Sequence, residues 1–389
     1  MSAPTGSPAP AEPTGPPDAY MRIAQLRFSA SKGDVAAATE LRAQLKERSM
    51  APLYTVVCEQ LGWKVDGALL ASMTAANAAE LEKLEARIVE CEEKEGETEI
   101  REAHLAKAEL LIKVGEKEKA YEAIEATFKK TVAMGPRLDL VLSKLRVGLF
   151  FEDLKVVKAE VDRAKALLEQ GGDWERRNRL KVYEALFLLR IRDLKKASAL
   201  LLDSIATFTA TELVSYNQFI LYAVTTSLIA MPRKDMKPKV IDAPEILQVI
   251  GEIPHAGELV NGLYTCQYRK LMQALVDICP VLYADRYFAP HVGYYWREAQ
   301  VLAYTQFLES YMSVSLQSMA ATFGVSPSVL DADLAKFIAM GRLSCSIDKV
   351  NGIVASTRPD TKNAQYQATL KQGDLLLNRV QKLSRVINV

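Results

Sequence analysis

"SLQSMAATFGVSPSVLDADLAKFIAMGRLSCSIDKVNGIVAS" (residues 315–356) contains two short amphipathic helices and then a hairpin. The apolar face of the first helix consists of Leu316, Met319, Ala320 and Phe323. Gly324 ends this helix, and Ser326 or Ser328 can cap the second one. The buried stripe of the second helix consists of Leu330, Leu334, Phe337 and Ile338.

The residues after the second helix alternate at the period of a strand. The apolar members of the alternation are Leu343, Cys345 and Ile347, and the polar members are Arg342, Ser344 and Ser346. A turn at 348–352 separates them from a second strand that begins at Ile353. The order helix, turn, helix, strand, turn, strand predicts a winged helix at about residues 312–357.

A winged helix often binds DNA, but the charges of this one argue against that function. Asp331 and Asp333 lie near the start of the second helix, where a DNA reader places Arg or Lys, and Lys336 is its single basic residue. The whole chain has a net charge of only +1, which provides no field for nucleic acid. We therefore expect no nucleic-acid partner. Instead, the outward-facing Arg342, Ser344 and Ser346 predict a protein interface at an open sheet edge.

The region before the winged helix, residues 20–190, has helical periodicity with regularly spaced turns. Gly115, Asp153 and Asp193 mark turns that are 38 and 40 residues apart, which is typical of stacked helix pairs. The sequence thus predicts a mainly α chain, with a tetratricopeptide-like solenoid here, and an irregular helical bundle is the alternative. Residues 1–19 hold six of the 16 prolines and predict a disordered tail.

Two segments between the solenoid and the winged helix need separate interpretation. Residues 213–231 carry no charge, yet their Ser, Thr, Asn and Gln side chains favour a buried core helix over a membrane span. The basic run RKDMKPK at 233–239 predicts an exposed connector in which Pro238 stops any helix.

The C-terminal segment, residues 358–389, predicts a single long helix after Pro359. Its apolar residues at steps of four, three and four are Leu376, Val380, Leu383 and Ile387. This spacing forms the seam of a coiled-coil-like contact, which Gly373 interrupts upstream. We expect the seam to contact other chains, and the alternative is that the helix folds back on its own domain.

No motif for chemistry is present. The sequence has no phosphate-binding loop, no nucleophile elbow and no HExxH pair, and its three histidines lack ligands at metal spacing. The five cysteines are scattered singly, which indicates a reducing compartment without disulfides. We therefore predict no catalytic residue, no metal and no cofactor.

Two further surface features are ambiguous. The acidic run at 85–102 is either a solvated helix face, which we favour, or a docking surface for a basic partner. Trp174 follows a good N-cap residue, Asp173, so we favour a staple at a helix start over a partner-binding hot spot.

Several stretches carry a resemblance to a known family. They are RIAQLRF (22–28), GETEIREAHLAKAE (96–109), GGDWERRNRLKVYEAL (171–186), FAPHVGYYWRE (288–298), GRLSCSIDKVNGIV (341–354) and GDLLLNRVQKLSRVIN (373–388). The chain after its Pro-rich tail resembles the PCI-containing non-ATPase lid subunits of the proteasome regulatory particle, which are paralogues of the signalosome's first subunit. The resemblance implies a PCI module at 191–357, followed by a C-terminal bundle helix.

The resemblance also implies a function. Members of this family are non-catalytic scaffolds in ubiquitin-dependent protein degradation. They pack their winged helices edge to edge, gather their C-terminal helices in a bundle and extend helical arms that can touch the ATPase ring. The implied partners are other lid subunits with PCI modules and the lid deubiquitinase assembly, with no membrane partner, in cytoplasm and nucleus. The alternatives are a signalosome subunit and a PCI subunit of a translation initiation factor, and an enzyme is the least favoured class.

Overall fold

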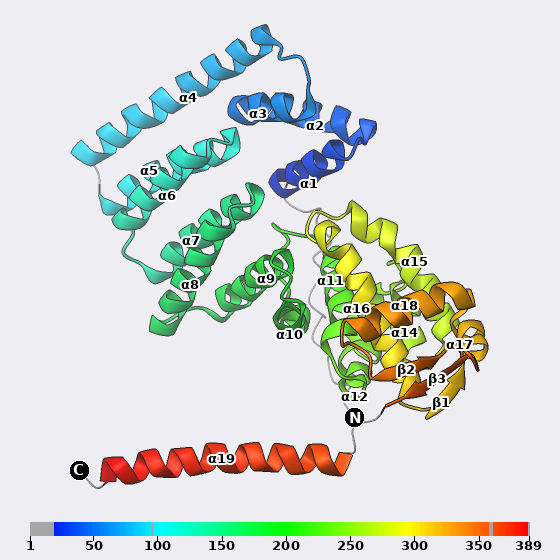
Figure 1. Cartoon of the computed structure of the whole chain (residues 1–389). Coiled ribbons are helices and arrows are strands. Elements are labelled where there is room, and N and C mark those ends of the chain that lie inside the picture. Colours follow the sequence, from blue (N-terminus) through cyan, green and yellow to red (C-terminus); the bar gives the residue numbers. More distant parts are fainter. Residues whose placement is uncertain (1–18, 95, 358–360, 388–389) are drawn as a thin grey trace, which may run out of the picture.

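The computed structural model describes residues 19–94, 96–357 and 361–387, and it confirms the predicted mainly α class (Figure 1). The predicted Pro-rich tail lies outside the described residues, except for Ala19, which begins the first helix. The first ten helices are α1 (Ala19–Ser31), α2 (Val35–Glu47), α3 (Ala51–Leu61), α4 (Gly67–Lys94), α5 (Glu97–Val114), α6 (Lys117–Lys130), α7 (Met134–Phe150), α8 (Leu154–Gln170), α9 (Trp174–Arg190) and α10 (Leu194–Ser204).

Helices α5 to α10 form three successive hairpins, α5/α6, α7/α8 and α9/α10, which lie in a curved row in Figure 1. The three predicted turn residues stand between the two helices of each hairpin. Gly115 takes a left-handed conformation at φ +86° and donates to the carbonyls of α5. Asp153 and Asp193 each accept a hydrogen bond from a backbone N–H in the first turn of the next helix. The predicted helix-pair period is therefore confirmed.

The hairpins are close-packed. At Gly148 on α7, an added Cβ would lie 2.8 Å from Cγ2 of Val157 on α8, so a larger residue would require the Val157 side chain or its helix to move. Helices α9 and α10 pack on each other across residue 190, and α10 also packs on α11. The helices on either side of the predicted 190/191 boundary therefore pack on each other.

The next segment builds a second helical group. Its elements are η1 (Ile205–Thr207), α11 (Tyr216–Ala230), α12 (Arg233–Met236), the π-helical turn η2 (Lys237–Ile241), α13 (Pro244–Val249), α14 (Ala256–Tyr264), α15 (Tyr268–Ala284), η3 (Ala289–His291) and α16 (Val292–Leu308). Helix α11 is the predicted buried core helix, and its hydroxyl groups donate to the backbone one turn earlier, as Thr226 does to Tyr222 O at 2.7 Å. Among the described residues, no helix combines the length and apolar character needed to cross a membrane.

The prediction that Pro238 stops any helix in the basic run was wrong. The run forms α12 and continues into η2, where Asp242 N donates to Lys237 O at 2.9 Å. Pro238 occupies the second position of η2, where its missing N–H costs no hydrogen bond within the turn. Met236 and Val240 are buried and attach this segment to the core.

The winged helix forms as predicted, with one additional strand. Its elements are β1 (Ser313–Ser315), α17 (Leu316–Phe323), α18 (Pro327–Ala339), β2 (Cys345–Asp348) and β3 (Ile353–Ser356). Gly324 ends α17 at φ +69°, and Ser326, not Ser328, caps α18 by accepting from Val329 N. The sheet order is β1-β3-β2, with both pairings antiparallel, so β3 is the central strand.

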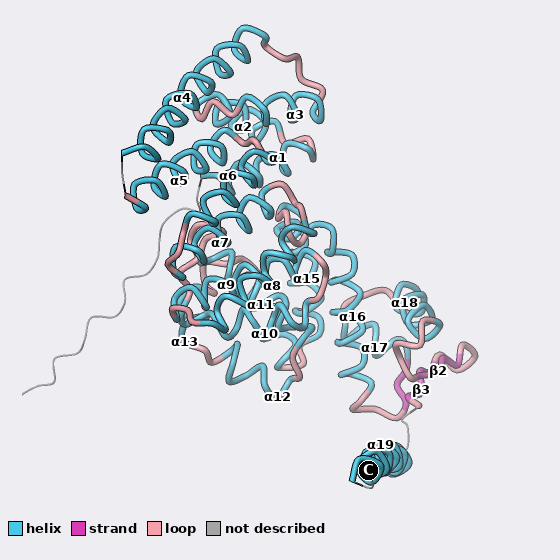
Figure 2. The backbone as a smooth tube through the Cα atoms, turned by 90° about the vertical axis from the view of Figure 1, so that its left-hand side faces the viewer, coloured by secondary structure: helices cyan, strands magenta, loops and turns pink. Residues whose placement is uncertain are grey.

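The last helix, α19 (Thr361–Ile387), runs without interruption through Gly373. Every side chain of α19 that the structure describes is exposed. Figures 1 and 2 both place this helix apart from the rest of the chain, and Figure 2 views it end on.

Helix α1 contacts both halves of the molecule, which are the helical repeats up to α10 and the second helical group with the winged helix. The Tyr20 ring stacks on Phe150 of α7, with 4.0 Å between centroids. On the same helix, Gln25 Nε2 donates to Ala284 O at 2.6 Å, and Gln25 Oε1 accepts from Arg286 N at 3.2 Å. The first helix of the chain is therefore hydrogen-bonded to the loop that follows α15.

That loop is organised by the buried carboxylate of Asp285. One oxygen accepts from Gln218 Nε2 at 2.6 Å and from Tyr222 OH at 2.5 Å. The other accepts from the backbone N–H groups of Tyr287 and Phe288 at 2.8 and 3.0 Å. Burial and the adjacent carboxylate raise the pKa of Tyr222 well above its ordinary value, so the hydroxyl stays protonated and donates.

This network predicts a large cost for Asp285→Ala. The substitution leaves four donors without their acceptor in a buried site, so we expect the free energy of unfolding to fall by about 3 kcal/mol. Urea unfolding followed by circular dichroism measures the change. As a control, Asp203→Ala removes a surface partner of Lys181 and should cost at most about 1 kcal/mol. Equal effects of the two substitutions would contradict the assignment.

Candidate protein-interaction surfaces

The three residues predicted to face out of the sheet occupy different environments. Ser346 lies on β2, an outer strand, and is exposed. Ser344 is exposed in the loop before β2, and its carbonyl accepts from Thr357 N at 2.9 Å. The predicted alternation begins at Arg342, so strand β2 begins three residues later, at Cys345, although Leu343 is buried as its alternation indicated.

Arg342 already has a partner within this chain. Its guanidinium makes two hydrogen bonds to the Glu298 carboxylate on α16, at 2.8 Å from Nη1 and 2.5 Å from Nη2. Hydrogen bonding to Glu298 raises the pKa of Arg342. A bidentate pair of this kind fixes the orientation of the side chain, so Arg342 connects the wing to α16 in the free chain.

The sheet exposes two outer strands. On one side β2 leads into a turn in which the Asp348 carboxylate accepts from Val350 N at 3.0 Å and Asn351 N at 3.2 Å. On the other side lies β1, which sequence reasoning missed. The exposed Tyr311 and Met312 directly precede β1. Because β3 is central, the outward backbone groups of β1 and β2 remain open to a strand from another chain.

The second helix of the winged helix, α18, presents carboxylates. Asp331 pairs with Lys349 of the hairpin turn at 2.9 Å, and Asp333 accepts from Gln300 Nε2 at 3.3 Å. These contacts bind α18 to the hairpin and to α16.

The predicted seam on α19 is fully presented to solvent in this chain. Leu376, Val380, Leu383 and Ile387 are between 55% and 71% exposed. Five more exposed apolar side chains on α19 were not singled out from the sequence, and they are Tyr366, Leu370, Leu375, Leu377 and Val386. The sequence could have indicated them, because they recur at the same helical spacing as the seam residues and lie on either side of the seam. The described part of α19 is not folded back on the winged helix.

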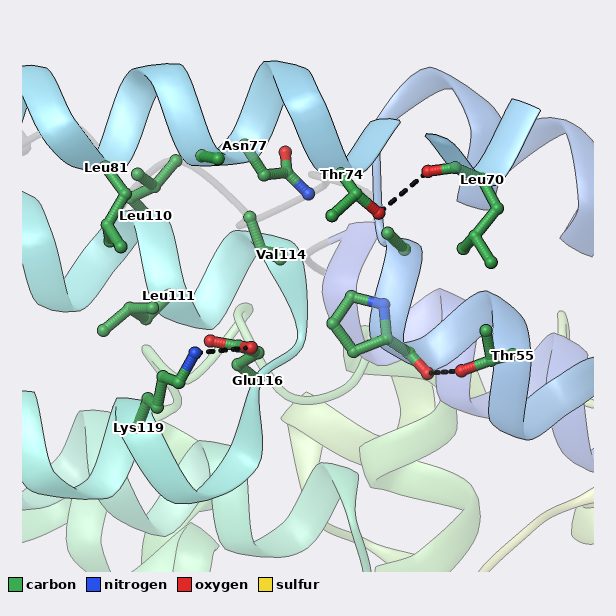
Figure 3. Close-up of a pocket in the computed structure, with 13 residues that line it drawn as sticks. Thr55, Leu70, Thr74, Asn77, Leu81, Leu110, Leu111, Val114, Glu116 and Lys119 are labelled. Carbon is green, nitrogen blue, oxygen red and sulfur yellow. Dashed lines mark hydrogen bonds and ion pairs between the residues drawn. The ribbon is translucent and has the colours of Figure 1, made fainter. Parts of the chain in front are cut away.

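An apolar groove lies between α3, α4, α5 and α6 (Figure 3). It has a volume of about 360 Å³, and Leu81, Leu110 and Val114 line it. Its polar neighbours are satisfied within the chain, since Asn77 Nδ2 donates to Ser49 O and Lys119 pairs with Glu116. The groove therefore offers an apolar packing surface.

The acidic run at 85–102 is divided between α4 and α5. Glu85 pairs with Lys107 at 2.7 Å, and Glu92 pairs with Lys130 at 3.3 Å, which lowers the pKa of Glu92. Ile88 and Cys91 within the run are buried. Neighbouring helices thus balance part of its charge, which favours the solvated-face interpretation over a docking surface.

The interpretation of Trp174 as a helix staple was wrong. Its side chain is 64% exposed. Asp173 occupies the N-cap position of α9 but makes no capping hydrogen bond, because its carboxylate instead pairs with Arg176 at 3.1 Å. Arg176 is also held by two hydrogen bonds to Asp139 on α7.

No constellation for metal chemistry is found in the described part of the chain. No group of three or more His, Cys, Asp or Glu side chains there could hold a metal ion. The histidines are separated, and His291 Nε2 lies 2.9 Å from the carbonyl oxygen of Arg190. None of the five cysteines forms a disulfide.

Three family models match successive parts of the chain. The model for 26S proteasome subunit RPN7 matches residues 66–239, and the PCI domain model matches residues 272–358. The model for the C-terminal helix of 26S proteasome regulatory subunit RPN7/PSMD6 matches residues 365–387, within α19.

Curated relatives agree with these matches. The chain is 50% identical over 345 residues to 26S proteasome non-ATPase regulatory subunit 6 homolog of Arabidopsis thaliana, covering 89% of each chain. It is 48% identical over 380 residues to the rice subunit 6, covering 95% of this chain and 97% of the relative. By contrast, COP9 signalosome complex subunit 1 of Arabidopsis thaliana is 28% identical over 166 residues, which cover 41% of this chain and 38% of the relative.

The Arg342–Glu298 contact predicts measurable coupling between the two side chains. In a double-mutant cycle with Arg342→Ala and Glu298→Ala, we expect a coupling energy of about 0.5–1 kcal/mol in the free chain. Chemical denaturation of the four proteins measures it. A second cycle that replaces Glu298→Ala with Asp331→Ala is the control, because Asp331 pairs with Lys349 instead. No coupling in the first cycle would show that Arg342 is not engaged within the chain.

Proposed function

Because this chain belongs to the RPN7/PSMD6 family of 26S proteasome regulatory subunits, we propose that it is a non-catalytic scaffold subunit of the regulatory particle lid. It supports ubiquitin-dependent protein degradation by assembling with other subunits. The observation that carries this function is α19, a helix of 27 residues whose apolar side chains no part of the described chain covers.

The distribution of apolar residues around α19 indicates more than one neighbouring helix. Successive residues are about 100° apart around a helix axis. Relative to the seam, Leu370 and Leu377 lie roughly 100° to one side, while Leu375 and Val386 lie roughly 90° to the other. A two-stranded contact would cover the seam alone. An apolar arc this wide fits a helix surrounded within a bundle.

The energy available from this burial is sufficient to hold a subunit in a complex. Burying the four seam residues contributes roughly 6–12 kcal/mol gross, before the cost of ordering the side chains and the partner helices. The flanking residues add to this gain. A free helix of this kind is therefore well suited to the last step of joining a complex.

The remaining partners follow from the other surfaces. The outer strands β1 and β2, with Ser344 and Ser346 beside the β2 edge, are proposed to contact the winged helices of other lid subunits with PCI modules. Through the lid the chain contacts the deubiquitinase assembly, and its helical arm reaches the ATPase ring. We also propose cytoplasm and nucleus as its compartments, which the absence of disulfides among the five cysteines supports. The signalosome alternative is weaker, because the similarity to that subunit covers less than half of this chain.

Substitution of the seam tests the proposal directly. The triple variant Leu376→Glu, Val380→Glu and Leu383→Glu should leave the monomer folded, because these side chains are exposed in the free chain. It should abolish incorporation into the lid, because three carboxylates cannot be buried in an apolar contact. Co-sedimentation with the other lid subunits measures incorporation.

The matched control places the same added charge on the polar side of the helix. Gln367→Glu, Asn378→Glu and Arg385→Gln change the net charge by the same three units, at positions opposite the seam and away from both apolar flanks. This variant should sediment with the lid like the unaltered chain. Normal incorporation of the seam variant, or equal loss in the control, would contradict the role of the seam.

The bundle arrangement makes a separate prediction for Leu375 and Val386, which lie on the side of the seam opposite Leu370. The double variant Leu375→Glu and Val386→Glu leaves the seam intact, yet we expect it to weaken lid incorporation at least tenfold, because a second neighbouring helix covers that side. Competition between tagged variant and unaltered chain for lid assembly measures the difference. Full competitiveness of the variant would favour a two-stranded contact over a bundle.

A further inference from the structure

A cleft of about 220 Å³ lies beneath α1, where this helix meets the end of α3 and the turn after α7. Its polar lining residues are Arg27, Ser31, Gln60, Glu152 and Arg286. Aromatic rings, including Phe150 and Phe151, form much of the remaining wall. The cleft is thus a small, partly apolar site with several charged groups.

Arg286 is the unusual member of this lining. Arg286 is only 4% exposed, and its Nη2 donates to Tyr287 OH at 2.5 Å. Its Nη1 is buried without a hydrogen-bond partner among the residues that the structure describes. No carboxylate of the described chain forms an ion pair with it. A buried guanidinium normally has such a partner, because an unpaired buried charge is costly.

A second guanidinium lines the same cleft. Arg27 donates from Nε and Nη2 to Gln60 Oε1, at 3.0 and 2.7 Å, so its Nη1 and the Gln60 amide nitrogen are left for other acceptors. The pKa of Arg27 is lowered, chiefly by burial. The negative charge of Glu152 raises this pKa, and the positive charge of Arg286 lowers it further. The two arginines therefore lie close enough to repel each other.

The one carboxylate in the lining, Glu152, stabilises the charges of both Arg27 and Arg286, but it is shared among several arginines. Glu152 Oε2 is bound by Nη2 of Arg190 at 2.5 Å, so this carboxylate is already shared with a third arginine. The cleft consequently has an excess of positive charge and of N–H donors over acceptors. This is the arrangement that recognises a small anion.

We propose that this cleft binds a small oxyanion of the phosphate or carboxylate type, held by Arg27 with the Gln60 amide as a further donor and attracted by the positive charge of the buried Arg286 in the cleft wall. The bound anion connects α1 and α3 to the loop after α15. It therefore stabilises the junction between the helical repeats and the second half of the chain, because a ligand that binds only the folded state raises its stability.

The test uses the full chain with inorganic phosphate and, separately, acetate as probes. Calorimetric titration and thermal unfolding are measured against sodium chloride at matched ionic strength. We expect saturable binding of at least one probe and a rise in melting temperature with its concentration. Phosphate alone identifies a tetrahedral anion, and acetate alone or with phosphate identifies a carboxylate-accepting site. Either result supports the proposal, and saturable binding of neither probe overturns it.

Three variants locate the site. Arg27→Gln should weaken binding about tenfold through loss of one charged hydrogen-bond donor. Glu152→Gln should strengthen binding severalfold, because it removes the competing carboxylate, and a purely structural role of this residue would not produce that gain. Arg297→Gln, an exposed arginine on α16 outside the cleft, should leave the affinity unchanged. Circular dichroism checks that each variant folds. If Arg27→Gln does not fold, the stronger anion binding expected of Glu152→Gln tests the proposal instead. Equal weakening by Arg27→Gln and Arg297→Gln, or no gain in Glu152→Gln, would overturn the proposal.

Discussion

The buried carboxylate of Asp285 is the constraint on which the arrangement of the two halves depends. It fixes the loop after α15 by accepting hydrogen bonds from α11 side chains and from two backbone amides of the loop itself. The loop in turn presents the Ala284 carbonyl and the Arg286 amide to α1. The first helix of the chain is thus positioned by a polar group more than 250 residues away in sequence, and the repeats between them follow.

The apolar helix faces of this chain are of two kinds, those buried within the chain and those left exposed on α19. Within the repeats and the PCI module, each helix finds its cover in a neighbour from the same chain, and the core is continuous from α1 to β3. On α19 the same residue types are left exposed, although the helix is as regular as the others. Periodicity decides that a helix forms, whereas the supply of neighbours decides whether its apolar face is buried in its own chain or in another.

Features with a local cause could be predicted from the sequence. Gly115, Asp153 and Asp193 act within one turn of the chain, so the helix pairs and their period were predictable. Strand β1 was not, because three residues are too few to show alternation and its partner β3 lies 40 positions later. The junction at α1 gives no local signal at all. Trp174 was misinterpreted because the expected cap is missing: Asp173 occupies the N-cap position, but its carboxylate accepts from Arg176, which the distant Asp139 also holds.

The exposed apolar side chains of α19 also limit the concentration of unassembled subunit that a cell can tolerate. On the proposed function, a copy that is incorporated into the lid buries these side chains, whereas a surplus copy keeps them exposed to every other hydrophobic surface. Unassembled molecules are then exposed to self-association and to the machinery that disposes of orphan proteins. The tolerable abundance of this chain is therefore set by the abundance of its neighbours, which links its stoichiometry to theirs.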